Sequence, residues 1–166
     1  MAGTVHTYRT TVEWEGSTAL GYDGYDRAHT ATAPPAEARL RLASDPAFLG
    51  QASLLNPEQL VVLAASSCQL LSFLAVAARA RIDVMAYSDE AEAVMPDDDR
   101  PVRITRIVLR PVITLAAGPP DRSPSEKRLR HLCEVAHREC YVANSLRTDV
   151  VVEPRFTTLP SGTRAV

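Results

Sequence analysis

Residues 56–81 read NPEQLVVLAASSCQLLSFLAVAARAR, and this stretch decides how the rest of the chain must be arranged. Asn56 is a good N-cap, Pro57 suits the first helical position because no amide hydrogen bond is lost there, and Gln59 can complete a capping box. We therefore predict a helix from Pro57 to about Arg81. The predicted helix is apolar on nearly every side, which places it in the centre of a core or an interface rather than at the surface.

The same helix raises the question of a membrane span. Residues 60–78 form 19 consecutive positions without a charge, about the length of a minimal transmembrane helix. Four polar side chains interrupt the run, its many alanines are only weakly hydrophobic, and no basic cluster flanks one end alone. The sequence therefore favours a buried helix of a soluble protein, and we expect no membrane partner.

Alternation of apolar and polar residues predicts β-strands on both sides of this helix. Before the helix the predicted strands are residues 6–14, 28–33 and 37–42, which we interpret as an antiparallel meander. In the first of them Tyr8, Val12 and Trp14 share one face, which predicts a half-buried strand. After the helix the predicted strands are residues 82–94, 102–115 and 149–156, with a bulge or an edge near Arg106.

A second helix is predicted between the last two of these strands. Ser123 is its expected N-cap, Pro124 its first residue and Glu126 the residue that closes a capping box, and the helix should run to about Glu139. Five residues share one face of this helix: Leu129, Leu132, Cys133, Ala136 and Cys140. The order of strands and helices predicts an α+β protein, with a single domain over residues 1–157 and a C-terminal tail over residues 158–166.

Composition narrows the range of functions. The 18 basic and 20 acidic residues leave a formal net charge of −2, and the pI is about 6.1, which argues against a nucleic-acid partner bound by phosphate neutralisation. The sequence contains no glycine-rich phosphate loop, HExxH, GxSxG or CxxC motif, so neither a cofactor nor a metal has a signature. The chain opens without an apolar leader segment, so we expect a reducing cytoplasm. In that compartment a cysteine pair is more often catalytic or metal-binding than a structural disulfide.

Three cysteines carry the possible chemistry, and each also has an ordinary packing interpretation. Cys68 lies in the middle of the apolar helix, where a cysteine commonly serves as a small buried hydrophobe. Cys140 closes the second helix after polar residues, so it can be accessible. Cys133, His137 and Cys140 share a helix face as a partial zinc site, although a closed site needs four ligands. From the residues alone these alternatives stay open.

Two passages of the sequence are specific when they are considered together. NPEQL at residues 56–60 is followed eight residues later by Cys68 in AASSC, and residues 136–145 read AHRECYVANS around Cys140. With their order and their 72-residue cysteine spacing, these motifs resemble the OsmC/Ohr family of organic hydroperoxide reductases, in particular its OsmC-like members. The resemblance covers most of residues 5–155. It implies an intertwined α+β homodimer in which strongly curved antiparallel sheets surround two central helices, with active sites at the subunit interface.

The resemblance also implies roles for four residues. Cys68 matches the family's peroxidatic cysteine, and Cys140 matches its resolving cysteine. Glu58 matches the acidic residue that holds the catalytic arginine, and Arg27 is the best candidate for that arginine by its distance ahead of the first cysteine motif. Tyr141 stands where the family's second motif usually has a proline.

Together these roles describe a thiol-dependent peroxidase. A guanidinium beside Cys68 would favour its thiolate, which is the form that attacks a peroxide oxygen. The resulting sulfenic acid would condense with Cys140 to a disulfide, and an external dithiol, of the lipoyl type in this family, would reduce that disulfide. An apolar wall would favour organic hydroperoxides over hydrogen peroxide; its expected members are Leu60, Leu63 and Leu71.

Two other functions stay open at this point. One is a non-catalytic or redox-sensing binding module on the same scaffold, and the other is a zinc-stabilised structural protein. The three functions differ in the fate of Cys68, which would form a catalytic disulfide, a stable sulfenic acid or neither. If Arg27 is not the catalytic arginine, Arg79 and Arg81 are the alternatives.

Overall fold

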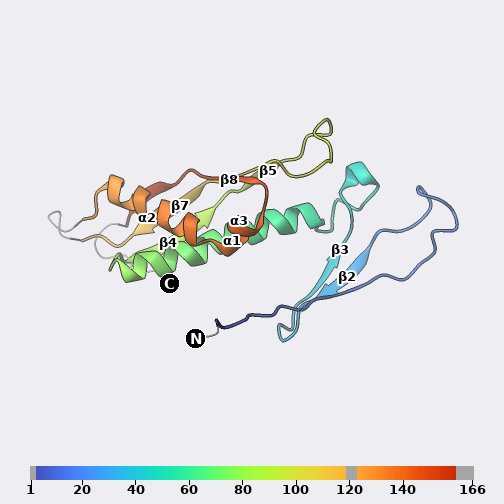
Figure 1. Cartoon of the computed structure of the whole chain (residues 1–166), viewed down its shortest axis with the longest axis horizontal. Coiled ribbons are helices and arrows are strands. Elements are labelled where there is room, and N and C mark those ends of the chain that lie inside the picture. Colours follow the sequence, from blue (N-terminus) through green and yellow to red (C-terminus); the bar gives the residue numbers. More distant parts are fainter. Residues whose placement is uncertain (1–2, 119–122, 160–166) are drawn as a thin grey trace. The chain divides into compact units, whose positions relative to one another are not determined.

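The computed structural model describes residues 3–118 and 123–159. It divides into two compact units, one up to Leu60 and one from Val61 onwards, and Figure 1 traces the chain through both of them. The helix α1 (Pro57–Arg79) begins before this division and lies mostly in the second unit. A single domain over residues 1–157 with a tail over 158–166 stays a prediction, and residues 160–166 of that tail lie outside the described part of the chain.

The first unit carries the predicted antiparallel meander. Its strands are β1 (Thr11–Glu13), β2 (His29–Thr32) and β3 (Arg39–Leu42), paired in the order β1-β2-β3, and a short 3₁₀ helix, η1 (Pro46–Phe48), follows them. The half-buried face predicted for residues 6–14 is wrong, because Tyr8 and Val12 are 88% and 63% exposed. Alternation determines which side chains share a face, but a face is buried only where a second layer covers it.

The capping box predicted for α1 is confirmed. The backbone N–H of Gln59 donates to Oδ1 of Asn56 over 2.8 Å, and the backbone N–H of Asn56 donates to Oε1 of Gln59 over 3.1 Å. The helix ends at Arg79 rather than at Arg81. Arg81 adopts a left-handed φ of 58°, and its N–H bonds back to the carbonyl of Ala78 over 3.1 Å. A left-handed residue ends a helix even where the apolar pattern continues.

One side of α1 is covered by its own chain. Its buried residues form a stripe at helical spacing: Ala65, Gln69, Phe73, Val76 and Ala77. Elsewhere on the helix Leu63, Leu71 and Leu74 are 58%, 64% and 38% exposed. By length and composition, α1 is a helix that a membrane could accommodate, but the core helix of a soluble protein meets the same two conditions.

The second unit contains two three-stranded sheets, with the orders β4-β7-β9 and β5-β6-β8. Their strands are β4 (Val84–Asp89), β5 (Glu92–Val94), β6 (Arg106–Leu109), β7 (Pro111–Leu115), β8 (Asp149–Val152) and β9 (Arg155–Thr158). The pairs β4–β7 and β5–β6 are antiparallel, whereas β8 and β9 run parallel to β6 and β7. The predicted α+β class is confirmed, with mixed sheets in this unit where antiparallel ones were expected.

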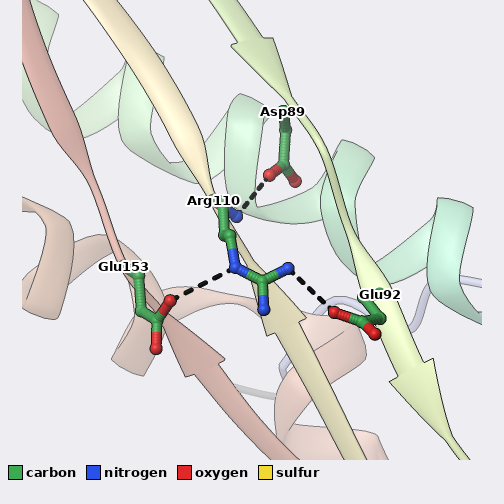
Figure 2. A network of polar contacts seen from close by, with 4 residues as sticks. All are labelled: Asp89, Glu92, Arg110 and Glu153. Atoms are coloured by element: carbon green, nitrogen blue, oxygen red, sulfur yellow. Dashed lines mark hydrogen bonds and ion pairs between the residues drawn. The ribbon is translucent and has the colours of Figure 1, made fainter.

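The three long strands predicted for the second unit are each interrupted at one network of polar contacts. The irregularity expected near Arg106 lies instead at Arg110. Figure 2 shows that the backbone N–H of Arg110 points to Asp89 rather than to a neighbouring strand, and it donates to Oδ1 of Asp89 over 2.6 Å. The Arg110 guanidinium also pairs with Glu92 (Nη1–Oε2 3.1 Å) and with Glu153 (Nε–Oε2 3.3 Å). Each predicted strand therefore passes from one sheet to the other beside Arg110.

α1 packs against each sheet through a separate apolar cluster. The larger cluster joins α1, β7 and α2 (Glu126–Glu139), and its buried members are Phe73, Val76, Ala77, Ile113, Leu115, Leu129, Cys133 and Ala136. The smaller cluster consists of Ala65, Ile107 and Leu109, with Val142 of α3 (Tyr141–Ser145) against it. Ser66 of α1 donates its hydroxyl to Asp89. This bond fixes α1 at the point where the strands change sheets.

α2 confirms the predicted buried face but begins later than expected. Four residues of that face are buried: Leu129, Cys133, Ala136 and Cys140. The helix starts at Glu126, and Oγ of Ser125 accepts the backbone N–H of Arg128 over 3.3 Å. The predicted N-cap, Ser123, is therefore wrong. Two serines stand two positions apart ahead of the helix, and the extended backbone at Ser125 selects the second as the cap.

Candidate active site

Cys68 and Cys140 come together within the second unit. Cys68 lies near the middle of α1 and is partly buried, whereas Cys140 joins α2 to α3 and is 1% exposed. The Cys68 thiol is near enough to Cys140 to raise the pKa of the Cys140 thiol, and both thiols are free. The fold thus brings together two sulfur atoms from distant segments of the sequence.

Local hydrogen bonds hold Cys140 in place. Its N–H donates to the carbonyl of His137 over 3.1 Å, and its Sγ accepts the N–H of Ala143 over 3.5 Å, so Cys140 caps the end of α2 and the start of α3. Burial raises the pKa of the Cys140 thiol to about 11. The amides of Ala143 and Val142 lower this pKa, whereas the hydrogen bond and the charge of Cys68 raise it. Cys140 is therefore a protonated thiol at neutral pH.

A groove of about 480 Å³ opens beside Cys68. One wall is a stripe of α1 at helical spacing: Cys68, Leu71, Ser72, Ala75 and Arg79. The other wall comes from the end of α2 and from α3: Arg138, Glu139, Tyr141 and Asn144. Of the predicted apolar wall, Leu71 lines this groove, whereas Leu60 and Leu63 are not among its lining residues. A groove with one apolar wall and a few polar groups can hold a small organic molecule against the Cys68 sulfur.

An ion pair joins the two walls of the groove. Nη2 of Arg79 lies 2.7 Å from Oε2 of Glu139, and Nε of Arg79 donates to the carbonyl of Ala75 over 3.2 Å. The arginine side chain therefore folds back along α1 toward Cys68. Glu139 is the last residue of α2 and directly precedes Cys140.

Glu58 and Arg27 have different surroundings. Glu58 lies in the first turn of α1, and its Oε2 is buried without a hydrogen-bond partner among the described residues. The Arg27 guanidinium donates to the carbonyls of Tyr25 (2.9 Å) and Tyr22 (2.6 Å), and it stacks 4.2 Å and 4.7 Å from the centroids of the same two rings. These bonds hold the guanidinium in its own loop. The pairing of Arg27 with Glu58, and its action on Cys68, stay predictions.

The comparison with protein families identifies the relationship. The sequence profile of OsmC-like proteins matches residues 50–155, a stretch that contains both cysteine motifs. This chain belongs to the OsmC family. The resemblance inferred from the two motifs is thereby confirmed. No curated protein sequence matches this OsmC-family chain significantly.

Solved structures agree with this membership. An OsmC-like protein of unknown function from Vibrio cholerae is 27% identical to this chain, covering 91% of this chain and 100% of its own length with a TM-score of 0.81. An organic hydroperoxide resistance protein OsmC from Legionella pneumophila is 17% identical over 93% of this chain and 99% of its own, with a TM-score of 0.66. An organic hydroperoxide resistance protein from Elizabethkingia anophelis is 16% identical over 94% of this chain and 99% of its own, with a TM-score of 0.68. The likeness to the last two establishes the fold.

Sequence reasoning missed the part of this OsmC-family site that lies farther along the groove. Arg79 follows Cys68 by 11 positions, which is about three helical turns and therefore the same helix face. Glu139 precedes Cys140 and so turns toward the same region. Helical spacing counted onward from Cys68 is the signal that would have found Arg79, which the sequence offered only as an alternative cation.

Polar groups also lie behind the two thiols. Gln69 is 1% exposed, its Nε2 donates to the carbonyl of Cys133 over 3.5 Å, and its Oε1 has no partner among the described residues. The buried Tyr87 hydroxyl likewise has no partner there. Burial raises the pKa of Tyr87, and the charges of Asp89, Cys133 and Cys140 raise it further. The sequence signal for this region was Gln69, whose side-chain amide lies in an apolar helix directly after Cys68.

Cys133 belongs to the core rather than to the groove. It is 3% exposed within the larger apolar cluster, and burial raises the pKa of its thiol to about 12. The described residues hold no group of three or more His, Cys, Asp or Glu side chains that could bind a metal ion. The partial zinc site considered for Cys133, His137 and Cys140 therefore gains no support from the structure.

Proposed function

We propose that this OsmC-family protein is a thiol-dependent peroxidase that reduces organic hydroperoxides through a Cys68 sulfenic acid and a Cys68–Cys140 disulfide. The observation that carries the proposal is the proximity of the Cys68 and Cys140 thiols beside an open groove. The names of the Legionella and Elizabethkingia proteins, which share the fold, support organic hydroperoxides as the class of substrate.

The proposed reaction balances over three steps. The Cys68 thiolate attacks the outer oxygen of the hydroperoxide, the O–O bond breaks, and the alcohol leaves after taking a proton, so that Cys68 becomes a sulfenic acid. The Cys140 sulfur then attacks the Cys68 sulfur, the S–O bond breaks, and water leaves. An external dithiol, of the lipoyl type, finally reduces the disulfide by exchange and is itself oxidised to a disulfide.

The surroundings of the two thiols determine which of them reacts first with the peroxide. Cys68 lines the groove and meets the substrate, whereas Cys140 is buried behind it with a pKa of about 11. A protonated Cys140 does not compete for the peroxide, because the thiolate is the nucleophile. When Cys68 becomes a sulfenic acid, Cys140 loses the neighbouring thiol whose charge and hydrogen bond raise its pKa. Its proton can then leave with the departing oxygen as water.

A guanidinium beside Cys68 completes the proposed site. The buried Oε2 of Glu58 has no partner among the described residues, and a buried carboxylate oxygen normally accepts a hydrogen bond. Arg27 is the proposed donor, because a planar guanidinium can bind a carboxylate and still face a thiolate. If Arg27→Ala leaves the peroxide reactivity of Cys68 unchanged, the role passes to Arg79.

A second copy of this chain is the proposed partner of α1. Leu63, Leu71 and Leu74 are exposed, and an apolar helix face of this kind needs a cover. We expect sedimentation equilibrium to give twice the chain mass of 18.1 kDa; a monomer would contradict the homodimer. The three free thiols fit the reducing cytoplasm that we propose as the compartment.

The decisive experiment follows both sulfur atoms after oxidation. Reduced protein is mixed with one equivalent of an alkyl hydroperoxide, quenched with an alkylating reagent at successive times, and analysed by peptide mass spectrometry. We expect a Cys68–Cys140 disulfide to form at the rate of steady-state turnover with a lipoyl dithiol. Hydrogen peroxide should react more slowly, because it gains nothing from the apolar wall. Oxidation without that disulfide would contradict the peroxidase.

A redox-sensing module is the alternative that one observation favours. The burial of Cys140 and its raised pKa disfavour the thiolate that resolves a sulfenic acid. If resolution is slow, Cys68 would persist as a sulfenic acid and report the oxidant instead of clearing it. The same time course separates the two functions, because a sensor accumulates the Cys68 sulfenic acid and does not turn over.

A further inference from the structure

The ion pair between Arg79 and Glu139 joins the two helices that carry the cysteines. Its atoms are 2.7 Å apart, and its side chains are 64% and 47% exposed. Arg79 is the last residue of α1, and Glu139 is the last residue of α2. Among the ion pairs of the described residues, this one connects α1 to α2, whereas the Arg130–Glu126 pair lies within α2 alone.

Both cysteines lie in segments that pack against the core, and these segments differ in the hydrogen bonds that hold them. The segment of α1 around Cys68 is fixed, because Ser66 bonds to Asp89 and Phe73 is fully buried in the larger cluster. Cys140 instead lies at a corner between α2 and the five-residue helix α3. The bonds that hold this corner are mostly internal to it, such as Nδ2 of Asn144 to the carbonyl of Arg138 over 2.9 Å.

Disulfide formation requires movement of this corner. A disulfide needs an S–S bond of about 2.05 Å, which is much shorter than a thiol–thiol hydrogen bond. Because Ser66 and Phe73 hold α1 on both sides of Cys68, we expect the end of α2 to supply most of this movement. A contact between α1 and the residue directly before Cys140 favours the arrangement in which the two sulfur atoms are close.

From this geometry we propose that Arg79 and Glu139 are positioning residues for the resolving step, in which Cys140 attacks the Cys68 sulfenic acid. This inference rests on the proposed peroxidase function. The ion pair acts on the position of Cys140 and leaves the attack of Cys68 on the peroxide unaffected. We therefore expect salt to slow the second step, disulfide formation, because exposed ion pairs are screened by salt.

The test measures the two steps separately in single-turnover experiments. Reduced protein is mixed with one equivalent of tert-butyl hydroperoxide, and quenched samples are analysed for the Cys68 sulfenic acid, as its dimedone adduct, and for the Cys68–Cys140 disulfide. We expect Arg79→Gln and Glu139→Gln to slow disulfide formation about two- to fivefold, the range that exposed ion pairs supply. The rate of loss of the Cys68 thiol should stay unchanged.

Three controls separate positioning from a general structural effect. Arg130→Gln removes the Arg130–Glu126 pair, which has the same 2.7 Å distance but lies within one helix, and it should leave both steps unchanged. The charge-reversed double variant Arg79→Glu/Glu139→Arg should restore the disulfide rate to within about twofold of the wild type. Raising the salt to about 1 M should slow the second step in the wild type but not in Arg79→Gln.

The outcomes that overturn the inference differ from those that overturn the function. If the wild type forms no Cys68–Cys140 disulfide, the peroxidase proposal itself fails. If the wild type forms it and both single variants do so at the same rate, the positioning role is excluded while the peroxidase stands. If the variants instead slow the loss of the Cys68 thiol, Arg79 acts on Cys68 directly, and the positioning role is again excluded.

Discussion

Cys133 lies in α2 and Cys140 directly follows it; the two are equally inaccessible and differ in what surrounds them. They are 3% and 1% exposed, and burial raises the pKa of their thiols to about 12 and about 11. Cys133 packs inside the larger apolar cluster, whereas Cys140 caps two helices, accepts an amide hydrogen bond and lies near the Cys68 thiol, which raises its pKa. Burial therefore does not distinguish Cys133 from Cys140, the proposed resolving cysteine. The distinction lies in the polar contacts available at the end of a helix.

The largest expected effect separates the two cysteines by function. Cys140→Ser should stop catalysis after one turnover, because the Cys68 sulfenic acid has no thiol to attack it and then persists or is overoxidised. Cys133→Ser should continue to turn over, because its thiol takes no part in the reaction. Steady-state peroxide consumption with a lipoyl dithiol measures both. Normal cycling by Cys140→Ser would mean that Cys133 resolves the sulfenic acid or that the proposed pairing is wrong.

The unfolding free energy should depend more on the residues around Cys133 than on those around Cys140. Leu129→Ala, one helical turn before Cys133, removes a side chain that is 3% exposed and should cost about 2–5 kcal/mol of unfolding free energy. Tyr141→Ala, next to Cys140, removes a side chain that is 82% exposed and should change the unfolding free energy by less than about 0.5 kcal/mol. Urea denaturation compares the two variants. Equal costs would mean that the corner around Cys140 is part of the core.

The pH dependence of stability should distinguish the cysteines by degree. Both thiols have a pKa raised above the ordinary value of 9.0, so the folded state favours their protonated forms. Their contribution to the unfolding free energy is complete below about pH 9 and is lost as the pH rises toward about 11 for Cys140 and about 12 for Cys133. Cys133→Ser should flatten this alkaline decline more than Cys140→Ser. The reverse order, in denaturation series above pH 9, would contradict the assigned environments.

The smallest expected effect concerns the hydrogen bonds at the corner. Asn144→Ala removes the bond from Nδ2 to the carbonyl of Arg138 and should cost about 0.5–1.5 kcal/mol. Hydrogen exchange should become faster at the amides of α3 but not at those around Cys133, because the corner is held locally. An increase that spreads over the whole of α2 would show that the two regions unfold as one.

Local sequence chemistry predicted several elements well. The reciprocal hydrogen bonds of Asn56 and Gln59 were predictable because a capping box involves residues only three positions apart. The buried face of α2 was predictable from helical spacing. The N-cap of α2 was not, because Ser123 and Ser125 both suit the position and the choice depends on the backbone around them. The predicted bounds of the strands were wrong for a different reason.

The interruption of the long strands could not be predicted from alternation. The apolar pattern continues through Arg110, and the residues that break the ladder there are Asp89, Glu92 and Glu153, all distant in the chain. Arg110 and Asp89 are 21 positions apart. A backbone amide that leaves its strand for a carboxylate has no local signature. The exposed face of β1 is a similar case, because burial depends on what packs against a strand.

For the candidate site, the two cysteine motifs indicated Cys68 and Cys140, and the structure added their proximity. The Arg79–Glu139 pair joins residues 60 positions apart and was not predicted as a pair. The proposed roles of Glu58 and Arg27 come from the resemblance, and the unpartnered Glu58 oxygen is the structural feature that supports one of them.

The sequence by itself determined the long apolar helix, its cap, the α+β class and the family, because these depend on spacing over a few residues or on short motifs. Only the tertiary structure decided which cysteine meets Cys68, which arginine lines its groove and where the strands change sheets. Those features depend on contacts between distant segments, and the free energy of such a contact belongs to both partners. Neither segment carries that information alone.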